Sequence, residues 1–176
     1  MKYMTMASEA GSLPLLVCCT ENHIELNGND LTSGIPYKGK SIYVDVKHGE
    51  PYFADILLAA PSLIPVISPK LASVLRERSF LYGEMIPIIN DFYNGFFVLN
   101  LIPRIELLDE NKSMAIFVNG NKIYYRAHLN KYSGQEGIFR IKNFATFPFV
   151  TDGVIQMFSQ FDHKGINFSD EMVTHD

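Results

Sequence analysis

The chain has 176 residues, of which 47% are hydrophobic and 19% are charged, so it can bury the core of one globular domain and is not composed like a disordered protein. The formal net charge of −4 and the lack of a basic run argue against non-specific nucleic-acid binding, because phosphate contacts need clustered Lys and Arg. No apolar run reaches the length of a membrane span, so we expect no membrane association.

The two cysteines, Cys18 and Cys19, are neighbours in the sequence. A disulfide between neighbours is disfavoured, because one trans peptide holds their Cα atoms closer together than a bridge prefers. Their spacing also fits neither a zinc site nor a redox motif. We interpret both as buried thiols of a protein in a reducing compartment, and we expect a cytoplasmic location.

The first part of the chain is rich in turn signals. We expect residues 1–40 to form an N-terminal extension or loop-rich segment with a polar, frayed start and one short apolar run at 15–20. Apolar and polar residues alternate over 41–46, which predicts a half-buried strand. A second short strand is expected over 54–58.

A helix is predicted over residues 69–78. Ser68 is a favourable N-cap because its hydroxyl can accept a bond from a free amide of the first turn, and Pro69 costs the helix no hydrogen bond at its first position. Leu71 and Leu75 then fall on one face at helical spacing. That apolar face needs a sheet to cover it.

Two apolar runs and a hairpin follow the helix. A strand is expected over 85–89, where Pro87 predicts an edge position or a bulge, and a fully buried strand is expected over 96–101. Residues 114–118 and 122–129 flank Asn119-Gly120, whose residue types favour the positive φ of a tight hairpin turn.

The last third of the chain predicts a strand over 138–141 and a second helix. Thr151 is a plausible N-cap for this helix, and Gly165 can end it. A last strand is expected at 166–168, followed by a polar tail over 169–176. Because the helices do not alternate regularly with the strands, we predict an α+β fold with a mostly antiparallel sheet and two principal helices packed on it, and a core domain over 41–168.

No local motif indicates catalysis. None of the five histidines has a metal-ligand spacing to another His, Cys or acid, and the chain has neither a phosphate-binding glycine loop nor a nucleophile elbow. We therefore expect no catalytic residue, no metal and no cofactor. A small hydrolase-like enzyme remains an alternative, because carboxylates can be assembled in space without a trace in the sequence.

Two loops are the candidate partner-binding sites. Asp91, Phe92 and Tyr93 combine an acid with two aromatics, and aromatic side chains on loops are enriched among binding hot spots. The alternative is that this loop folds back and packs its aromatics into the core. Asp109 and Glu110 form a charged turn that could meet a basic partner or simply be solvated.

A set of short apolar segments, in a fixed order between about residues 43 and 168, resembles the bacterial polymorphic-toxin immunity proteins of the immunity-protein-eleven type. The matching pieces are Asp55-Ile56-Leu57, Val66-Ile67-Ser68 with Leu71 and Leu75, residues 85–88, 96–100, 138–141, 147–152 and 165–168.

This resemblance implies a small α+β protein that binds and neutralises a cognate toxin encoded beside it, with no catalysis and no cofactor. It carries no motif that assigns a toxin-contacting residue. The sequence leaves open a homo-oligomer, and a regulatory or structural dimer is a further alternative to an immunity protein.

Overall fold

The computed structural model describes residues 1–6, 15–27, 31–49, 51, 53–60, 63–118, 120–163 and 166–175. The protein is mostly β, with 45% strand and 11% helix. Asn119, expected in the hairpin turn, and Gly165, expected after the second helix, lie outside the described residues, as do parts of the expected extension and the last residue of the tail.

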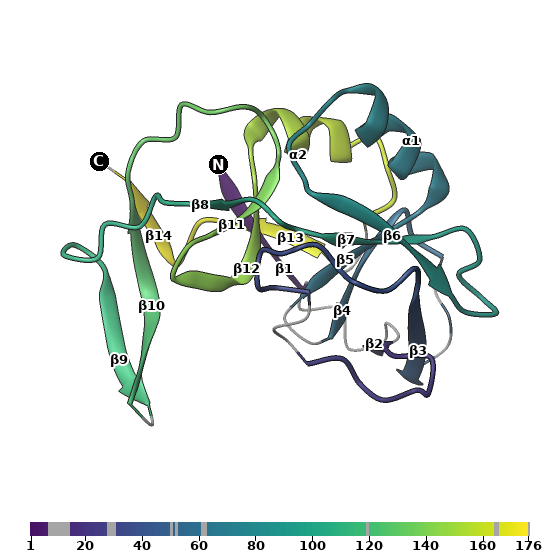
Figure 1. The fold of residues 1–176 in the computed structure, drawn as a ribbon. Helices are drawn as coiled ribbons and strands as arrows, with labels where there is room; N and C mark the ends of the chain where they lie inside the picture. The colour runs from purple at the N-terminus through teal and green to yellow at the C-terminus, as the bar shows by residue number, and fades with distance from the viewer. Residues whose placement is uncertain are drawn as a thin grey trace.

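Six strands close into a barrel, which occupies the right-hand half of the molecule in Figure 1. In their order around the barrel, they are β2 (Leu15–Cys19), β3 (Ile42–His48), β6 (Glu84–Ile89), β7 (Phe97–Asn100), β5 (Ile64–Ile67) and β4 (Ile56–Ala60). β2 pairs with β4 and β3 pairs with β6 in parallel, and the other junctions are antiparallel. Buried aliphatic residues such as Leu16, Val44 and Val98 belong to one apolar cluster of the barrel.

Two further sheets extend from the barrel. The five-stranded sheet has the order β13 (Ile166–Ser169), β1 (Lys2–Met6), β12 (Phe144–Val150), β11 (Ile138–Ile141) and β8 (Arg104–Ile105). The three-stranded sheet has the order β14 (Val173–His175), β10 (Asn121–Leu129) and β9 (Met114–Val118). A second apolar cluster joins the two sheets, with Phe139 and Phe149 packed among Leu129 and Val173.

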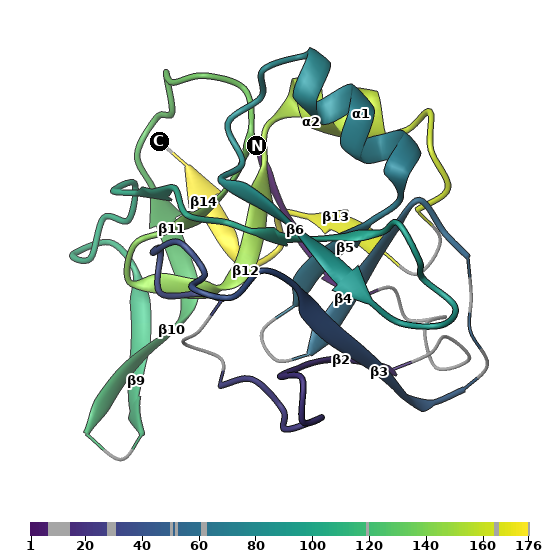
Figure 2. The same cartoon turned by 45° about the vertical axis from the view of Figure 1, so that its right-hand side comes forward.

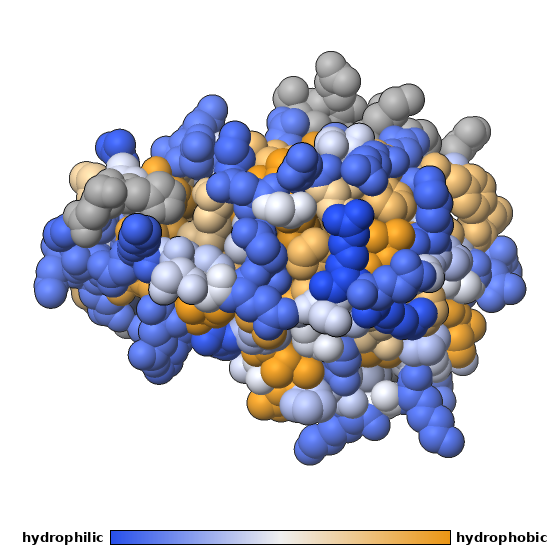
Figure 3. All heavy atoms as spheres, turned by 90° about the horizontal axis from the view of Figure 1, so that it is seen from above, coloured by the Kyte–Doolittle hydropathy of each residue, from blue (hydrophilic) through white to orange (hydrophobic). Residues whose placement is uncertain are grey.

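The two described helices, α1 (Pro69–Glu77) and α2 (Asp152–Phe158), lie together over the same end of the molecule in both ribbon views (Figures 1 and 2). Leu71 and Leu75 of α1 pack in one cluster with Phe158 of α2 and with barrel residues such as Ile67 and Leu99. Seen from above, this end is mostly hydrophilic, with apolar side chains visible between the polar ones (Figure 3). The helices therefore cover a core and present an ordinary solvated surface.

Ser68 connects α1 to the barrel and to the segment after α2. Its hydroxyl accepts a hydrogen bond from the Leu71 amide at 3.2 Å and donates one to Asp55 Oδ1 at 2.7 Å. The other carboxylate oxygen of Asp55 accepts a bond from the Asp162 amide at 3.2 Å. One buried serine thus caps the helix and fixes the carboxylate that holds the two helical segments together.

The predicted fold class is wrong. The protein is not a mostly antiparallel sheet with two principal helices packed on it, because six of its strands close on themselves and, in the described part of the chain, two short helices cover one end. The individual elements were easier to predict: the Ser68-capped helix, strands β6 and β7 and the β9–β10 hairpin with Gly120 at φ +80° are all present. Barrel closure depends on which strands pair, and that is decided by contacts between residues far apart in the chain.

Three local expectations also need correction. The start of the chain is not frayed over Lys2–Met6, because β1 pairs with β12 on one side and with β13 on the other. The polar tail contains β14, which pairs in parallel with β10. β6 is not an edge strand, since it pairs with both β7 and β3; the β3 pairing covers only Ile88 and Ile89, so Pro87 sits just before the point where that neighbour begins.

We expect Ser68→Ala to lower the free energy of unfolding by about 1–3 kcal/mol, because it removes both the helix cap and a bond to a carboxylate. Ser73→Ala is the matched control, since Ser73 is exposed in the same helix and bonds only Glu77 among the described contacts; it should change stability by less than about 0.5 kcal/mol. Urea denaturation measures both. Equal effects of the two substitutions would contradict this role of Ser68.

Candidate functional site

The loop between β6 and β7 contains three of the expected contact residues, and the structure separates them. Asp91 is exposed and Phe92 has 53% of its surface exposed, whereas Tyr93 is completely buried. The Tyr93 ring packs against Phe96 and Phe53, with ring centroids 5.4 and 5.8 Å apart. The loop therefore turns one aromatic outward and the next inward, so that of the three expected residues only Asp91 and Phe92 are available to a partner.

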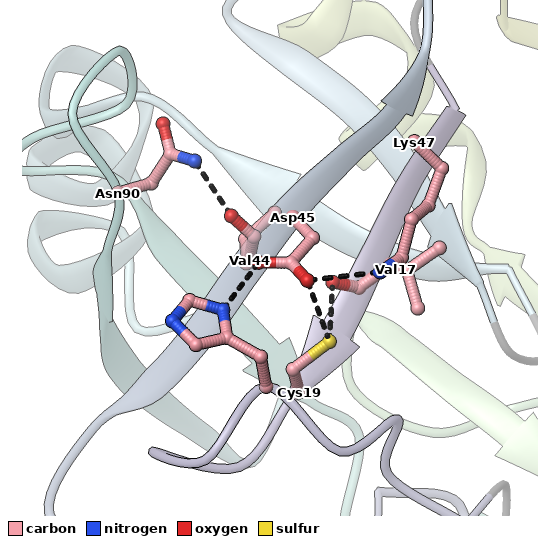
Figure 4. A network of polar contacts seen from close by, with 7 residues as sticks. Val17, Cys19, Val44, Asp45, Lys47 and Asn90 are labelled. Atoms are coloured by element: carbon pink, nitrogen blue, oxygen red, sulfur yellow. Dashed lines mark hydrogen bonds and ion pairs between the residues drawn. The ribbon is translucent and has the colours of Figure 1, made fainter.

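Asn90 holds the loop in this conformation. Its Oδ1 accepts hydrogen bonds from the amides of Phe92 at 2.7 Å and Tyr93 at 3.1 Å. Its Nδ2 donates to the Val44 carbonyl of β3 at 2.6 Å, the bond drawn in Figure 4. The sequence analysis missed this residue. The signal was present, because Asn commonly bonds backbone amides two residues further on and so starts a tight turn.

An open groove of about 460 Å³ runs between β3 and this loop. Ile89 and Phe92 contribute apolar side chains to it, and Ile89 has 45% of its surface exposed. Polar residues line the groove from both sides: His23, Asp45 and Lys47 come from β3 and the loop before it, and Asn90 and Asp91 come from the β6–β7 loop. The groove thus places an exposed apolar ridge beside a group of charged side chains.

Asp45 is the centre of these polar contacts (Figure 4). Its Oδ1 lies 2.8 Å from His23 Nδ1, and its Oδ2 accepts bonds from Lys47 Nζ at 3.0 Å and from the Cys19 thiol at 3.6 Å. The hydrogen bond from His23, followed by the one from Lys47, lowers the pKa of the Asp45 carboxyl. The carboxylate is therefore charged at neutral pH and fixes the positions of the two basic side chains.

Cys19, Asp45 and His23 have the residue types of a catalytic triad but not its arrangement. In a cysteine nucleophile the histidine contacts the sulfur, and a third group orients the histidine. Here the carboxylate lies between the thiol and the imidazole. Burial, with the nearby charge of Asp45, raises the pKa of the Cys19 thiol, and burial raises that of Cys18 to about 12. Both thiols are therefore held in the unreactive protonated form.

Asp109 and Glu110 precede β9, and the Asp109 amide donates to the His128 carbonyl of β10 at 2.9 Å. The β9–β10 hairpin lies on the opposite side of the molecule from the barrel in Figure 1. Asp109 Oδ1 accepts bonds from the Asn111 and Lys112 amides at 3.0 and 3.2 Å, so this side chain stabilises its own turn. Glu110 contacts Lys122 Nζ at 3.4 Å and accepts a bond from Asn143 at 2.9 Å. The structure does not bring these two acids together with Asp91 and Phe92.

The described residues contain no group of three or more His, Cys, Asp and Glu side chains that could hold a metal ion. No helix in the described part of the chain has the length and apolar character needed to span a membrane. When the chain is compared with known proteins, no family model and no curated protein matches it.

We expect Tyr93→Ala to lower the free energy of unfolding by about 3–5 kcal/mol, as is typical of truncating a buried aromatic. Phe92→Ala is the matched control in the same loop, and it should cost less than about 1 kcal/mol because the ring is half exposed. Chemical denaturation followed by circular dichroism measures both changes. A Tyr93→Ala protein as stable as the wild type would contradict the buried position.

The two cysteines should not react with a thiol reagent at pH 8 while the protein is folded, because both are buried and have raised pKa values. In denaturant both should react completely. Counting labelled thiols by mass spectrometry gives the result directly. Fast labelling of Cys19 in the folded protein would instead support a nucleophilic role.

Proposed function

We propose that this chain is a cytoplasmic immunity protein: it binds the toxin encoded beside its own gene and blocks that toxin by protein–protein contact. The proposal starts from the resemblance in the order of short apolar segments between residues 43 and 168. It includes no catalytic step, no metal and no cofactor. The contact surface that we propose consists of Ile89, Asp91 and Phe92, together with His23, Asp45 and Lys47 on the opposite side of the groove.

The observation that carries the proposal is the exposed position of Phe92 on a loop held by Asn90. A half-exposed phenylalanine contributes little to the stability of the free protein. In a complex the same ring could enter a pocket of the partner and act as an anchor, as buried aromatics do at hot spots. Because Asn90 already fixes the loop, binding would cost little additional conformational entropy.

The charged side of the groove supports the same function. Asp45 holds His23 and Lys47 in place, so the groove offers positive and negative groups in a defined pattern beside the apolar ridge. A polar rim around an apolar centre is the usual composition of a protein interface. The rim charges would favour correct association, and the apolar centre would slow dissociation.

An enzymatic function has less support. The best nucleophile candidate near the groove is Cys19, but its thiol is buried and bonded to the Asp45 carboxylate instead of to an imidazole. A mechanism based on a serine or a pair of carboxylates would need a further set of catalytic side chains. Binding to a partner needs only the exposed Phe92, the loop fixed by Asn90 and the charged side chains around Asp45.

Co-expression with the adjacent toxin should restore growth, and the two proteins should form a complex of nanomolar affinity or better, on the order of −12 kcal/mol. Phe92→Ala should raise the dissociation constant at least about tenfold, mainly through faster dissociation. Affinity is measured by surface plasmon resonance with a catalytically inactive toxin.

Phe117→Ala is the matched control, because Phe117 is the same residue type, is 74% exposed and lies on the distant β9–β10 hairpin. It should change the dissociation constant by less than about twofold. If the wild-type protein fails to protect against the adjacent toxin, the immunity function is wrong. If it protects but Phe92→Ala binds as tightly as the wild type, the function stands and the proposed surface is wrong.

A further inference from the structure

The β9–β10 hairpin extends away from the body of the protein in both ribbon views (Figures 1 and 2). Among the described strands, β9 (Met114–Val118) pairs only with β10, so it forms the edge of the three-stranded sheet. An edge strand presents backbone N–H and C=O groups that can pair with a strand of another chain. β9 can therefore pair with another chain unless its sequence or shape protects this edge.

β9 has none of the usual protective features of an edge strand. Its sequence, Met-Ala-Ile-Phe-Val, contains no charged residue and no proline. The register irregularity of this pair falls between Tyr124 and Arg126 on β10, and not on β9. Most of the large apolar side chains of the hairpin are exposed by between 41% and 74%: Met114, Ile116, Phe117, Val118, Ile123 and Tyr125.

The register of the hairpin determines which backbone groups of β9 are open. Val118 pairs with Asn121 and Ile116 pairs with Ile123, in a hairpin with two residues between its strands. The residues that flank such a turn exchange hydrogen bonds, and hydrogen-bonded pairs alternate along an antiparallel ladder. Val118 and Ile116 therefore direct their backbone groups toward β10, whereas Ala115 and Phe117 direct theirs toward the open edge.

We propose that β9 is the docking edge for a second copy of this chain, and that two β9 strands pair antiparallel about a two-fold axis at Ile116. In this register Ala115 of one copy lies opposite Phe117 of the other, and these are the residues whose backbone groups face outward. Their N–H and C=O groups can then bond each other in both directions. The two three-stranded sheets become one continuous sheet across the axis.

A second copy fits this edge for two reasons. The two residues that offer open backbone groups are symmetric about Ile116, which is what an isologous contact requires. The chain carries a formal net charge of −4, so most contacts between two copies would bring like charges together, but β9 has no charged side chain to repel its equivalent. The proposal does not depend on toxin binding, which we assign to a different surface.

The contact involves one short strand from each copy, so it belongs at the small end of protein interfaces. We therefore expect a dissociation constant on the order of micromolar. Sedimentation velocity between about 1 and 200 µM should show a change from one chain of 19.9 kDa toward twice that mass. A protein that stays monomeric over the whole range overturns the proposal.

Ile116→Lys and Ile123→Lys are a matched pair that tests the geometry. The two isoleucines lie opposite each other in the hairpin and are exposed by 52% and 47%, but only Ile116 is on the edge strand. Ile116→Lys places two ammonium groups at the axis and should raise the dissociation constant at least about tenfold, while Ile123→Lys should change it less than about threefold. Equal weakening by both would show that the partner covers the face of the hairpin and would overturn edge pairing.

A cysteine at the axis gives a second readout that does not depend on affinity. Opposed residues of a non-hydrogen-bonded antiparallel pair have Cα atoms about 4.5 Å apart, which is within the range of a disulfide. Oxidised glutathione should therefore convert Ile116→Cys into a covalent dimer, with Cys18 and Cys19 still reduced because they are buried. Ile123→Cys should form no covalent dimer under the same conditions. Equal cross-linking of both variants, or none of Ile116→Cys, overturns the register.

Discussion

The candidate site depends on the short parallel junction between β3 and β6. Only two residue pairs, Ile42 with Ile88 and Tyr43 with Ile89, join these strands, yet the barrel is closed through them. The junction places the end of β6 beside the start of β3, so that Asn90 can bond the Val44 carbonyl. Phe92 and the Asp45 contacts then lie on the two sides of one groove. The β3–β6 pairs that close the barrel therefore also position the two sides of the proposed binding surface.

Neighbouring residues of the β6–β7 loop have separate roles as a result. Tyr93 packs in the barrel core and so stabilises the loop from inside the protein, whereas Phe92 is half exposed, adds little stability and remains available to a partner. The fixed loop also limits the entropy that binding has to overcome. Of the residues that we propose as partner contacts, Asp91 and Phe92 lie outside the strand pairs that close the barrel, whereas Ile89 belongs to one of them. Asp91 and Phe92 can therefore vary with little effect on folding.

Local signals in the sequence predicted local structure well. Ser68-Pro69 identified the start of α1, and Asn119-Gly120 identified the β9–β10 hairpin, because each depends on residues within a few positions. Barrel closure and the position of β1 could not be predicted in this way. β1 is completed by strands at the far end of the chain, since Lys2 pairs with Val150 and Met6 pairs with Ile166, and no pattern within a single segment encodes that pairing. The candidate site could not be predicted for the same reason. His23 and Asp45 come together only after folding, and the turn at Asn90 determines which of the two adjacent aromatics, Phe92 or Tyr93, is exposed.

Hydrogen exchange of the complex between this protein and the toxin that we propose as its partner tests the central claim most directly. If the Phe92 surface binds the toxin, exchange slows on binding in peptides that cover residues 89–95 and strand β3, with little change in α1 and in the β9–β10 hairpin. Protection confined to the hairpin or to the helix-covered end, with unchanged exchange over residues 89–95, would contradict toxin recognition through the Phe92 surface.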